Sequence, residues 1–202
     1  VRTVRKPEEL TIVQEEIDGQ YVEKKYSGHK VSRWENPFET FKDIYFRDCS
    51  IEFLRQVPEE KPFAMFTYLW APHPPLRVPE PYASMYPPEK LVLPDNIGIT
   101  AKGEPSLRRK GVPAQLAEHV TEEEWRQVWS AHLALTTMAD EVLGTILEEL
   151  KKQGKYENTC VVFTADHGDN LGQHRMYQKM EMYEEDIKVP LVIRLPGGKT
   201  GH

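Results

Sequence analysis

The sequence predicts an α/β fold in which a β-sheet is covered by helices. Short apolar runs, typical of buried strands, occupy residues 62–70, 160–164 and 190–195. One long stretch with the period of an α-helix, residues 121–152, lies between the first two runs. Strands that alternate with a long helix are typical of sheets whose faces are covered by helices.

The N-terminal segment, residues 1–40, is predicted to be irregular apart from one β-hairpin. Thr11-Ile12-Val13 and Tyr21-Val22 flank Asp18-Gly19. An Asp-Gly pair between β-prone residues is typical of a hairpin turn. Residues 24–37 show little periodicity and are predicted to be a loop.

Two helices are predicted from apolar residues that recur with the helical period. The first ends before Pro58, and its apolar face consists of Phe41, Ile44, Tyr45, Ile51 and Leu54. The second begins at a capping box formed by Thr121 and Glu124, and Gly154 suits its C-terminal end.

Two of the predicted strands end at residues that could do chemistry. His73 follows the run 62–70, and Asp166 follows the run 160–164. Ligands of open α/β sheets bind beyond the carboxyl ends of the strands, so His73 and Asp166 are predicted to belong to one site. The stretch 72–113 is rich in proline and long for a loop, which is typical of a functional loop.

Asp166-His167-Gly168 is a candidate metal-ligating motif. A carboxylate and an imidazole side by side at a strand end can both reach a metal ion, and Gly168 lets the backbone turn away without a Cβ clash. Taken alone, the tripeptide fits a turn with a capped helix behind it equally well.

The residues that follow Gly168 form an ordered pattern. The chain continues as Asp169-Asn170-Leu171-Gly172-Gln173-His174, then Gln178-Lys179-Met180-Glu181-Met182-Tyr183-Glu184-Glu185, then Val189-Pro190-Leu191. This segment resembles the sulfatase family, which has a strand followed by Asp-His-Gly-Glu, Leu-Gly-x-His, a Lys, Met-Tyr-Glu-Glu and Val-Pro-Leu. Asp169 stands where many members have Glu.

A second segment upstream is also similar to that family. Lys61-Pro62-Phe63 and Ala71-Pro72-His73-Pro74-Pro75 resemble its Lys-Pro-Phe strand and its His-Pro-Pro loop. From about Phe41 to Gly197 the chain can be followed as a sulfatase. We therefore interpret residues 1–40 as an irregular segment with a hairpin and residues 41–202 as the C-terminal portion of a sulfatase catalytic domain.

The resemblance implies an incomplete alkaline-phosphatase-like fold and the hydrolysis of sulfate esters. It implies that Asp166 and His167 supply two ligands of a metal ion and that His73 and Lys179 are catalytic residues that contact the sulfate. Breaking a sulfate ester requires the negative sulfuryl oxygens to be held and neutralised, which a divalent cation, a Lys and a His can do. Lys179 could also protonate or stabilise the leaving oxygen.

The metal and its surroundings leave several alternatives. The resemblance favours Ca²⁺, whereas an Asp/His pair would also suit manganese or zinc because Ca²⁺ prefers oxygen ligands. His174 is a candidate for an outer position, where it would hold a metal ligand or the loop. Basic residues of the long loop could meet an anionic substrate, although solvated side chains are the commoner case; they are Arg77, Arg108, Arg109 and Lys110.

The nucleophile of the family has no counterpart in this sequence. Family members use formylglycine, made from the Cys or Ser of a Cys/Ser-x-Pro/Ala-x-Arg motif, and neither Cys49 nor Cys160 stands in such a motif. The family's N-terminal Asp-Asp metal pair is absent as well. We expect both in an N-terminal part of a longer protein, with this fragment inert alone; a degenerate homologue is the alternative. Cys160 is expected to be a core thiol and His132 a packed core histidine.

Two further functions stay open. A phosphonate monoester hydrolase or phosphodiesterase of the same superfamily would share the His73 and Asp-His-Gly elements, and an inert fragment or binding module is the alternative without catalysis. The expected partner is a small-molecule or glycan sulfate ester. The resemblance favours a periplasmic or secreted protein.

The overall charge and hydropathy argue against two classes of partner. The formal net charge is −6 and no block of Lys and Arg stands out, so nucleic acid is not an expected partner. No apolar run approaches the ~20 residues that span a bilayer. The sequence does not indicate an oligomeric state.

Overall fold

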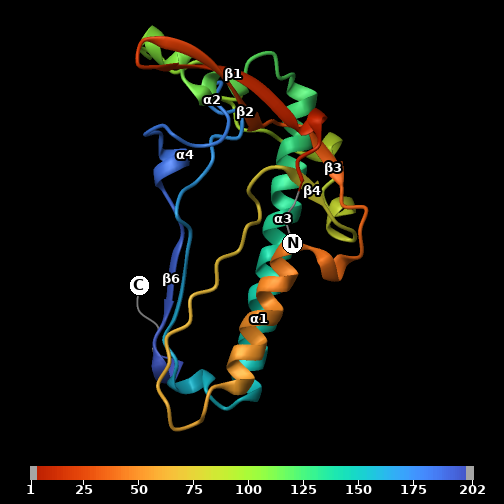
Figure 1. The fold of residues 1–202 in the computed structure, drawn as a ribbon, viewed down its shortest axis with the longest axis vertical. Helices are drawn as coiled ribbons and strands as arrows, with labels where there is room; N and C mark the ends of the chain where they lie inside the picture. Colours follow the sequence, from red (N-terminus) through yellow and green to blue (C-terminus); the bar gives the residue numbers. More distant parts are fainter. Residues whose placement is uncertain (1–3, 199–202) are drawn as a thin grey trace.

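The computed structural model describes residues 4–198, so the outermost residues of the two predicted segments, 1–3 and 199–202, lie outside it. Figure 1 shows an elongated molecule whose long axis follows α3, Glu122–Lys152. α1, Lys42–Gln56, lies along the C-terminal half of α3. Both helices are confirmed, at close to the predicted bounds.

The predicted capping box fixes the start of α3. Thr121 Oγ1 accepts a hydrogen bond from the Glu124 amide at 3.3 Å, and the Glu124 carboxylate accepts from the Thr121 amide at 3.0 Å. At the other end Gly154 has a φ of 66°, a backbone conformation that favours glycine and ends the helix. Lys151 and Lys152 lie in the last turn, where positive charge is favourable.

The N-terminal hairpin is confirmed as well. β1, Leu10–Ile17, pairs antiparallel with β2, Gln20–Ser27, and Asp18 and Gly19 both have positive φ, as a tight two-residue turn requires. The predicted loop 24–37 is wrong in part, because β2 extends to Ser27 and β3, Val31–Arg33, follows. β3 pairs in parallel with β4, Leu76–Val78, which directly follows the Pro72–Pro75 loop.

Shorter elements complete the described chain. α2 is Val112–Leu116, α4 is Glu184–Ile187, and the C-terminal strands are β5, Val161–Thr164, and β6, Leu191–Arg194. Short 3-10 helices lie at Pro7–Glu9, Phe38–Thr40, Tyr82–Ser84, Pro88–Lys90, Ser106–Lys110, Tyr156–Asn158 and Pro196–Gly198. Within residues 4–198, none of the helices combines the length and apolar character that crossing a bilayer requires.

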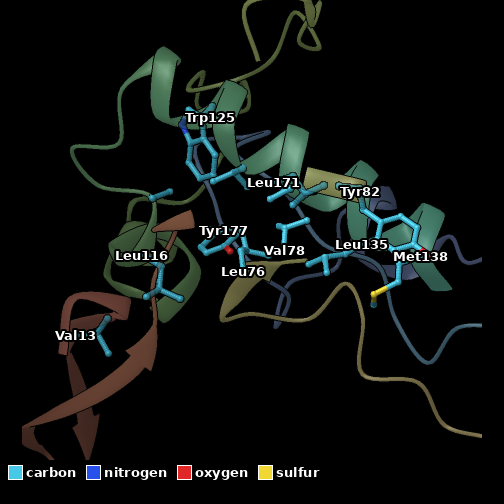
Figure 2. Packing of buried hydrophobic residues seen from close by; sticks show 14 residues of the cluster. Val13, Leu76, Val78, Tyr82, Leu116, Trp125, Leu135, Met138, Leu171 and Tyr177 are labelled. Carbon is cyan, nitrogen blue, oxygen red and sulfur yellow. The ribbon is translucent and has the colours of Figure 1, made fainter. Parts of the chain in front are cut away.

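The larger hydrophobic core lies between the N-terminal half of α3, β4 and the loop around residue 171 (Figure 2). Trp125 and Tyr177 meet edge to face with ring centroids 5.6 Å apart. Gly172 packs flat against Trp125, and a Cβ there would lie 2.6 Å from the indole ring. This contact requires glycine and fixes the loop that follows the Asp-His-Gly motif against α3.

A second core joins α1 to α3. Its buried members are Ile44, Leu54, Val142, Ile146 and Leu150. Three residues of the extended segment 62–70 pack against this core, and so does Val161 of β5; the three are Phe63, Met65 and Leu69. Segment 62–70 and β5 therefore lie against the same pair of helices.

The predicted sheet is only partly present. β5 pairs antiparallel with β6, and residues 62–70 are extended but form no strand. Phe66 and Tyr68 are 80% and 78% exposed, and Val192 is 60% exposed. The prediction that these runs are buried strands is therefore wrong for the outer face of residues 62–70 and for both faces of β6, which are exposed within residues 4–198. Cys160, expected to be a core thiol, is exposed as well.

Candidate active site

His73 and Lys179, far apart in the sequence, are in direct contact. Lys179 Nζ lies 2.8 Å from His73 Nε2. His73 Nδ1 lies 2.6 Å from the Pro74 carbonyl oxygen, so Nδ1 carries the proton and donates to that oxygen. Nε2 is thereby left as the acceptor for a hydrogen bond from the Lys179 ammonium group.

The surroundings of His73 keep its ring neutral. Burial lowers the pKa of His73, the hydrogen bond to the Pro74 carbonyl oxygen raises it in part, and the positive charges of Lys179 and Arg5 lower it further. A neutral imidazole here can orient the ammonium group without repelling it.

Asp166 and His167 follow the end of β5, as predicted. His167 Nδ1 lies 2.7 Å from the Gly168 carbonyl oxygen, which makes Nδ1 the donor and leaves Nε2 with a free lone pair. His167 Nε2 is 3.6 Å from Asp166 Oδ2, and the Asp166 side chain is 89% exposed. The two side chains present a nitrogen and an oxygen ligand on one side of the turn.

Gly168 is required for the turn behind this pair. A Cβ at this position would lie 1.8 Å from the Glu185 carbonyl oxygen. The Gly168 amide donates to the Asp186 carbonyl oxygen at 2.8 Å. The motif is therefore held by close backbone contact with the start of α4.

Asp166 and His167 fit a divalent cation as part of a coordination sphere. Carboxylate oxygen and imidazole nitrogen are both metal ligands. A zinc site needs about four ligands and a calcium site about six to eight. In the described range, 4–198, no three or more His, Cys, Asp or Glu residues are grouped to hold a metal ion. The pair could therefore supply two ligands of such an ion, and the others would have to come from elsewhere.

Buried polar residues hold the loop that carries Lys179. Asp169 Oδ1 accepts from the amides of Leu171 and Gln178 at 3.0 and 2.9 Å. Burial raises the pKa of Asp169 to about 6. The Asn170 side-chain amide donates to the Gln178 carbonyl oxygen at 2.8 Å and to Asp186 Oδ1 at 2.9 Å.

Asp186 connects this loop to the metal-ligand motif. Its Oδ2 accepts from the Glu181 amide at 3.1 Å, and its carbonyl oxygen accepts from the Gly168 amide. Asn170 and Asp186 are 0% and 4% exposed. The sequence analysis missed both as site residues, because neither belongs to a periodic pattern and their partners are mostly backbone groups.

His174 lies outside the immediate site and does not contact Asp166 or His167 by a hydrogen bond. Its Nε2 is 3.1 and 3.2 Å from the two carboxylate oxygens of Glu185, and its ring stacks on Tyr183 with centroids 4.0 Å apart. Glu185, which the sequence analysis did not single out, links His174 to Gly168 through its carbonyl oxygen.

The basic residues of the long loop are mostly engaged with the protein. Arg77 binds the buried carboxylate of Glu9, so the expectation of a solvated side chain is wrong there. Arg109 donates to the carbonyl oxygens of His174 and Arg175 at 3.3 and 2.8 Å. Arg108 Nη1 lies 3.3 Å from Glu181 Oε2. These three side chains hold loops together.

Comparison with known proteins identifies relatives of this chain. The model of the family described as "Sulfatase" matches residues 13–201. The chain is 29% identical over 174 residues to the multifunctional alkaline phosphatase superfamily protein PehA of Trinickia caryophylli, covering 80% of this chain and 34% of the relative. It is 32% identical over 175 residues to arylsulfatase K of Mus musculus, covering 79% and 31%.

A solved structure agrees with these relatives in fold. The phosphonate monoester hydrolase SpPMH from Silicibacter pomeroyi superposes with a TM-score of 0.64 at 32% identity, covering 81% of this chain and 34% of that one. The fold is therefore part of an alkaline-phosphatase-like α/β fold, as predicted. The chain spans about a third of the length of the relatives that it matches.

Proposed function

We propose a function from the premise that this chain belongs to the sulfatase family. The protein that contains it hydrolyses sulfate esters. His73 and Lys179 contact the sulfuryl group, and Asp166 and His167 are two ligands of a divalent metal ion. The observation that carries this proposal is the 2.8 Å contact between His73 Nε2 and Lys179 Nζ.

The charges of these residues suit the reaction. The Lys179 ammonium group neutralises a sulfuryl oxygen and donates a proton to, or stabilises, the leaving oxygen. The neutral His73 ring holds that ammonium group in place through Nε2. A bound divalent metal ion would supply further neutralisation of the sulfuryl oxygens. Asp169, Asn170 and Asp186 hold the loop so that Lys179 stays in reach.

The identity of the metal ion is a separate part of the proposal. We infer Ca²⁺ from the family resemblance. We also infer that His174 supports the metal site indirectly, through its contact with the Glu185 carboxylate. The nitrogen of His167 would also suit Mn²⁺ or Zn²⁺. Activity of the metal-depleted protein after addition of each ion separates them: restoration by Zn²⁺ or Mn²⁺ but not by Ca²⁺ would contradict the calcium assignment.

The nucleophile of the proposed reaction is a formylglycine outside this sequence. Cys49 is followed by Ser50-Ile51-Glu52-Phe53 and Cys160 by Val161-Val162-Phe163-Thr164, and neither matches the motif that is oxidised. We therefore expect the 202-residue chain alone to be inert and to bind calcium weakly. Tight calcium binding by this chain, measured by calorimetry, would contradict that expectation.

The deciding experiment compares two ester classes on the protein that contains this chain. A small aryl sulfate and a phenyl phosphonate monoester are hydrolysed under the same conditions and kcat/KM is measured for each. We expect the sulfate ester to be preferred. Preference for the phosphonate would favour the second candidate, a phosphonate monoester hydrolase, which the likeness to SpPMH brings into consideration.

The natural substrate class and the compartment are proposed from the family resemblance alone. We propose a small-molecule or glycan sulfate ester as substrate and a periplasmic or secreted location. Fractionation of the source cells with an antibody against this chain tests the location, and recovery in the cytoplasmic fraction would contradict it.

A further inference from the structure

Asp43 is a buried carboxylate that the proposed reaction does not use. It lies in the first turn of α1 and is 0% exposed. Its Oδ1 accepts hydrogen bonds from the backbone amides of Trp70 and Ala71, at 2.5 and 3.0 Å. Burial of a carboxylate is unfavourable unless hydrogen bonds compensate it. Both bonds go to Oδ1 and offset part of this cost, whereas the buried Oδ2 has no hydrogen-bond partner among the described residues, 4–198.

The two amides belong to the turn that ends at His73. The Trp70 carbonyl oxygen accepts from the His73 amide at 2.9 Å, and the Trp70 and His73 rings lie 4.5 Å apart between centroids. Lys42, the neighbour of Asp43, places its Nζ 3.8 Å from the centroid of the Trp70 ring. The first turn of α1 thus contacts both the backbone and the side chain of Trp70, the residue whose carbonyl oxygen binds the His73 amide.

These contacts matter because segment 62–70 has no hydrogen-bonded strand beside it within residues 4–198. In a sheet, neighbouring strands would fix the position of its last residues. Here Asp43 supplies the acceptor for the last two amides before the loop. We propose that Asp43 is a positioning residue, whose carboxylate holds the 70–73 turn so that His73 Nε2 meets Lys179 Nζ. The proposal rests on the function proposed above for His73 and Lys179.

The first test measures the turn in the 202-residue chain without any substrate. The Asp43→Ala variant removes the acceptor, and Asp43→Asn retains one side-chain oxygen. We expect Asp43→Ala to accelerate amide hydrogen exchange at Trp70 and Ala71 by about tenfold or more. We also expect the pKa of His73, measured by NMR, to rise towards its ordinary value because burial and contact with Lys179 are lost. Asp43→Asn should remain close to the unaltered chain in both measurements.

Leu54→Ala is the matched control. Leu54 lies on the same helix, is 0% exposed and belongs to the core between α1 and α3, so its truncation destabilises the chain without touching the turn. It should leave the His73 pKa and the relative exchange of the Trp70 and Ala71 amides unchanged. Equal effects of Leu54→Ala and Asp43→Ala would overturn the proposal. If Asp43→Ala does not fold, Asp43→Glu replaces it, because it keeps the charge and displaces the oxygen by one methylene group.

The second test separates this proposal from the proposed function. In the protein that contains this chain, Asp43→Ala should lower kcat for the sulfate ester about tenfold or more with a smaller change in KM. Asp43→Asn should restore most of the loss. Wild-type turnover by His73→Ala would overturn the proposed function and leave the NMR result standing. Unchanged His73 signals in Asp43→Ala would overturn the positioning role and leave the proposed function standing.

Discussion

Lys179 and His73 meet as a charged donor and a neutral acceptor, and the two roles are not interchangeable. The proton on His73 Nδ1 is engaged by Pro74, so Nε2 has only a lone pair to offer. Burial and the positive charges of Lys179 and Arg5 further disfavour protonation of the ring. The contact therefore orients the ammonium group of Lys179 without neutralising it, as its proposed contact with the sulfuryl oxygens requires.

Replacing Lys179 tests that role. We expect Lys179→Ala, in the protein that contains this chain, to lower kcat/KM for an aryl sulfate by about 10²–10³-fold, because a charge donor to the reacting group is lost. Lys179→Arg should restore little, since a guanidinium group does not give up a proton. The control is Lys188→Ala, whose ammonium group pairs with Glu184 on the surface. Turnover of Lys179→Ala at the wild-type rate would contradict the assigned role.

His132 gives a prediction about pH and stability. Burial alone lowers its pKa to about 4, consistent with the packed histidine expected from the sequence. The unfolded chain takes up this proton near pH 6.5 and the folded chain only near pH 4, so the stability that the neutral ring contributes is present above pH 6.5 and lost as pH falls towards 4. We expect a loss of ~2–3 kcal/mol in the free energy of unfolding across this window.

Chemical denaturation at several pH values between 4 and 7.5 measures that loss. The His132→Leu variant should show a visibly smaller slope. The remainder should be the balance between His29 and His73, whose pKa values burial also lowers, and Asp169, whose raised pKa gives a slope of the opposite sign. The same slope in His132→Leu as in the unaltered chain would show that this histidine is not the source.

The sequence could indicate the candidate site residues that belong to motifs, but not the residues that hold them in place. His73, Asp166, His167 and Lys179 stand in short ordered patterns. Asp43 and the pair Asn170 and Asp186 mainly bind backbone amides and carbonyl groups of distant segments. Such contacts depend on tertiary structure and leave no local pattern in the sequence, so only the three-dimensional structure reveals them.

At the scale of elements, the signals that succeeded were local. The Asp-Gly turn, the capping box and the helical period each depend on residues close in sequence, and the hairpin, α1 and α3 match them. The apolar runs 62–70, 160–164 and 190–195 were recognised, but a strand also needs a partner. Only β5 and β6 find one, in each other, whereas residues 62–70 find none within the described chain.

The cap of α3 can be tested by itself. We expect Thr121→Ala to lower the free energy of unfolding by about 1 kcal/mol, because the Glu124 amide loses its acceptor and the Glu124 carboxylate loses the Thr121 hydroxyl as a donor. Thr136→Ala is the control. Thr136 lies in the middle of α3, and its hydroxyl donates to the His132 carbonyl oxygen, one turn earlier in the same helix, instead of capping an end. Urea denaturation of both variants should show the loss in Thr121→Ala alone; equal losses would contradict the capping role.

At the scale of the whole molecule, the structure has one well-covered face and one apolar face. Segment 62–70 and β5 pack their inner residues against the core of α1 and α3. Their outer residues Phe66, Tyr68 and Val162 are exposed. β6 is exposed on both of its faces, at Leu191, Val192 and Ile193. Strands that are apolar on both faces are typical of sheets covered on both sides. Exposed apolar surface of this kind favours association.

We therefore expect the 202-residue chain to self-associate and to bind a hydrophobic dye such as ANS. Introducing charge on the apolar face should reduce both effects, because a lysine there cannot be buried in a contact between chains. The double variant Phe66→Lys and Ile193→Lys is designed for this purpose, because Ile193 pairs with Val162 on the face opposite Val161, and the inward-facing residues of both segments stay unchanged. Light scattering coupled to size-exclusion chromatography measures the association.

Val92→Lys is the matched control, since Val92 is 95% exposed in a loop away from this face. An unaltered chain that is monomeric and does not bind the dye would contradict the expectation. If Val92→Lys lowered the association equally, the effect would come from net charge instead of the apolar face.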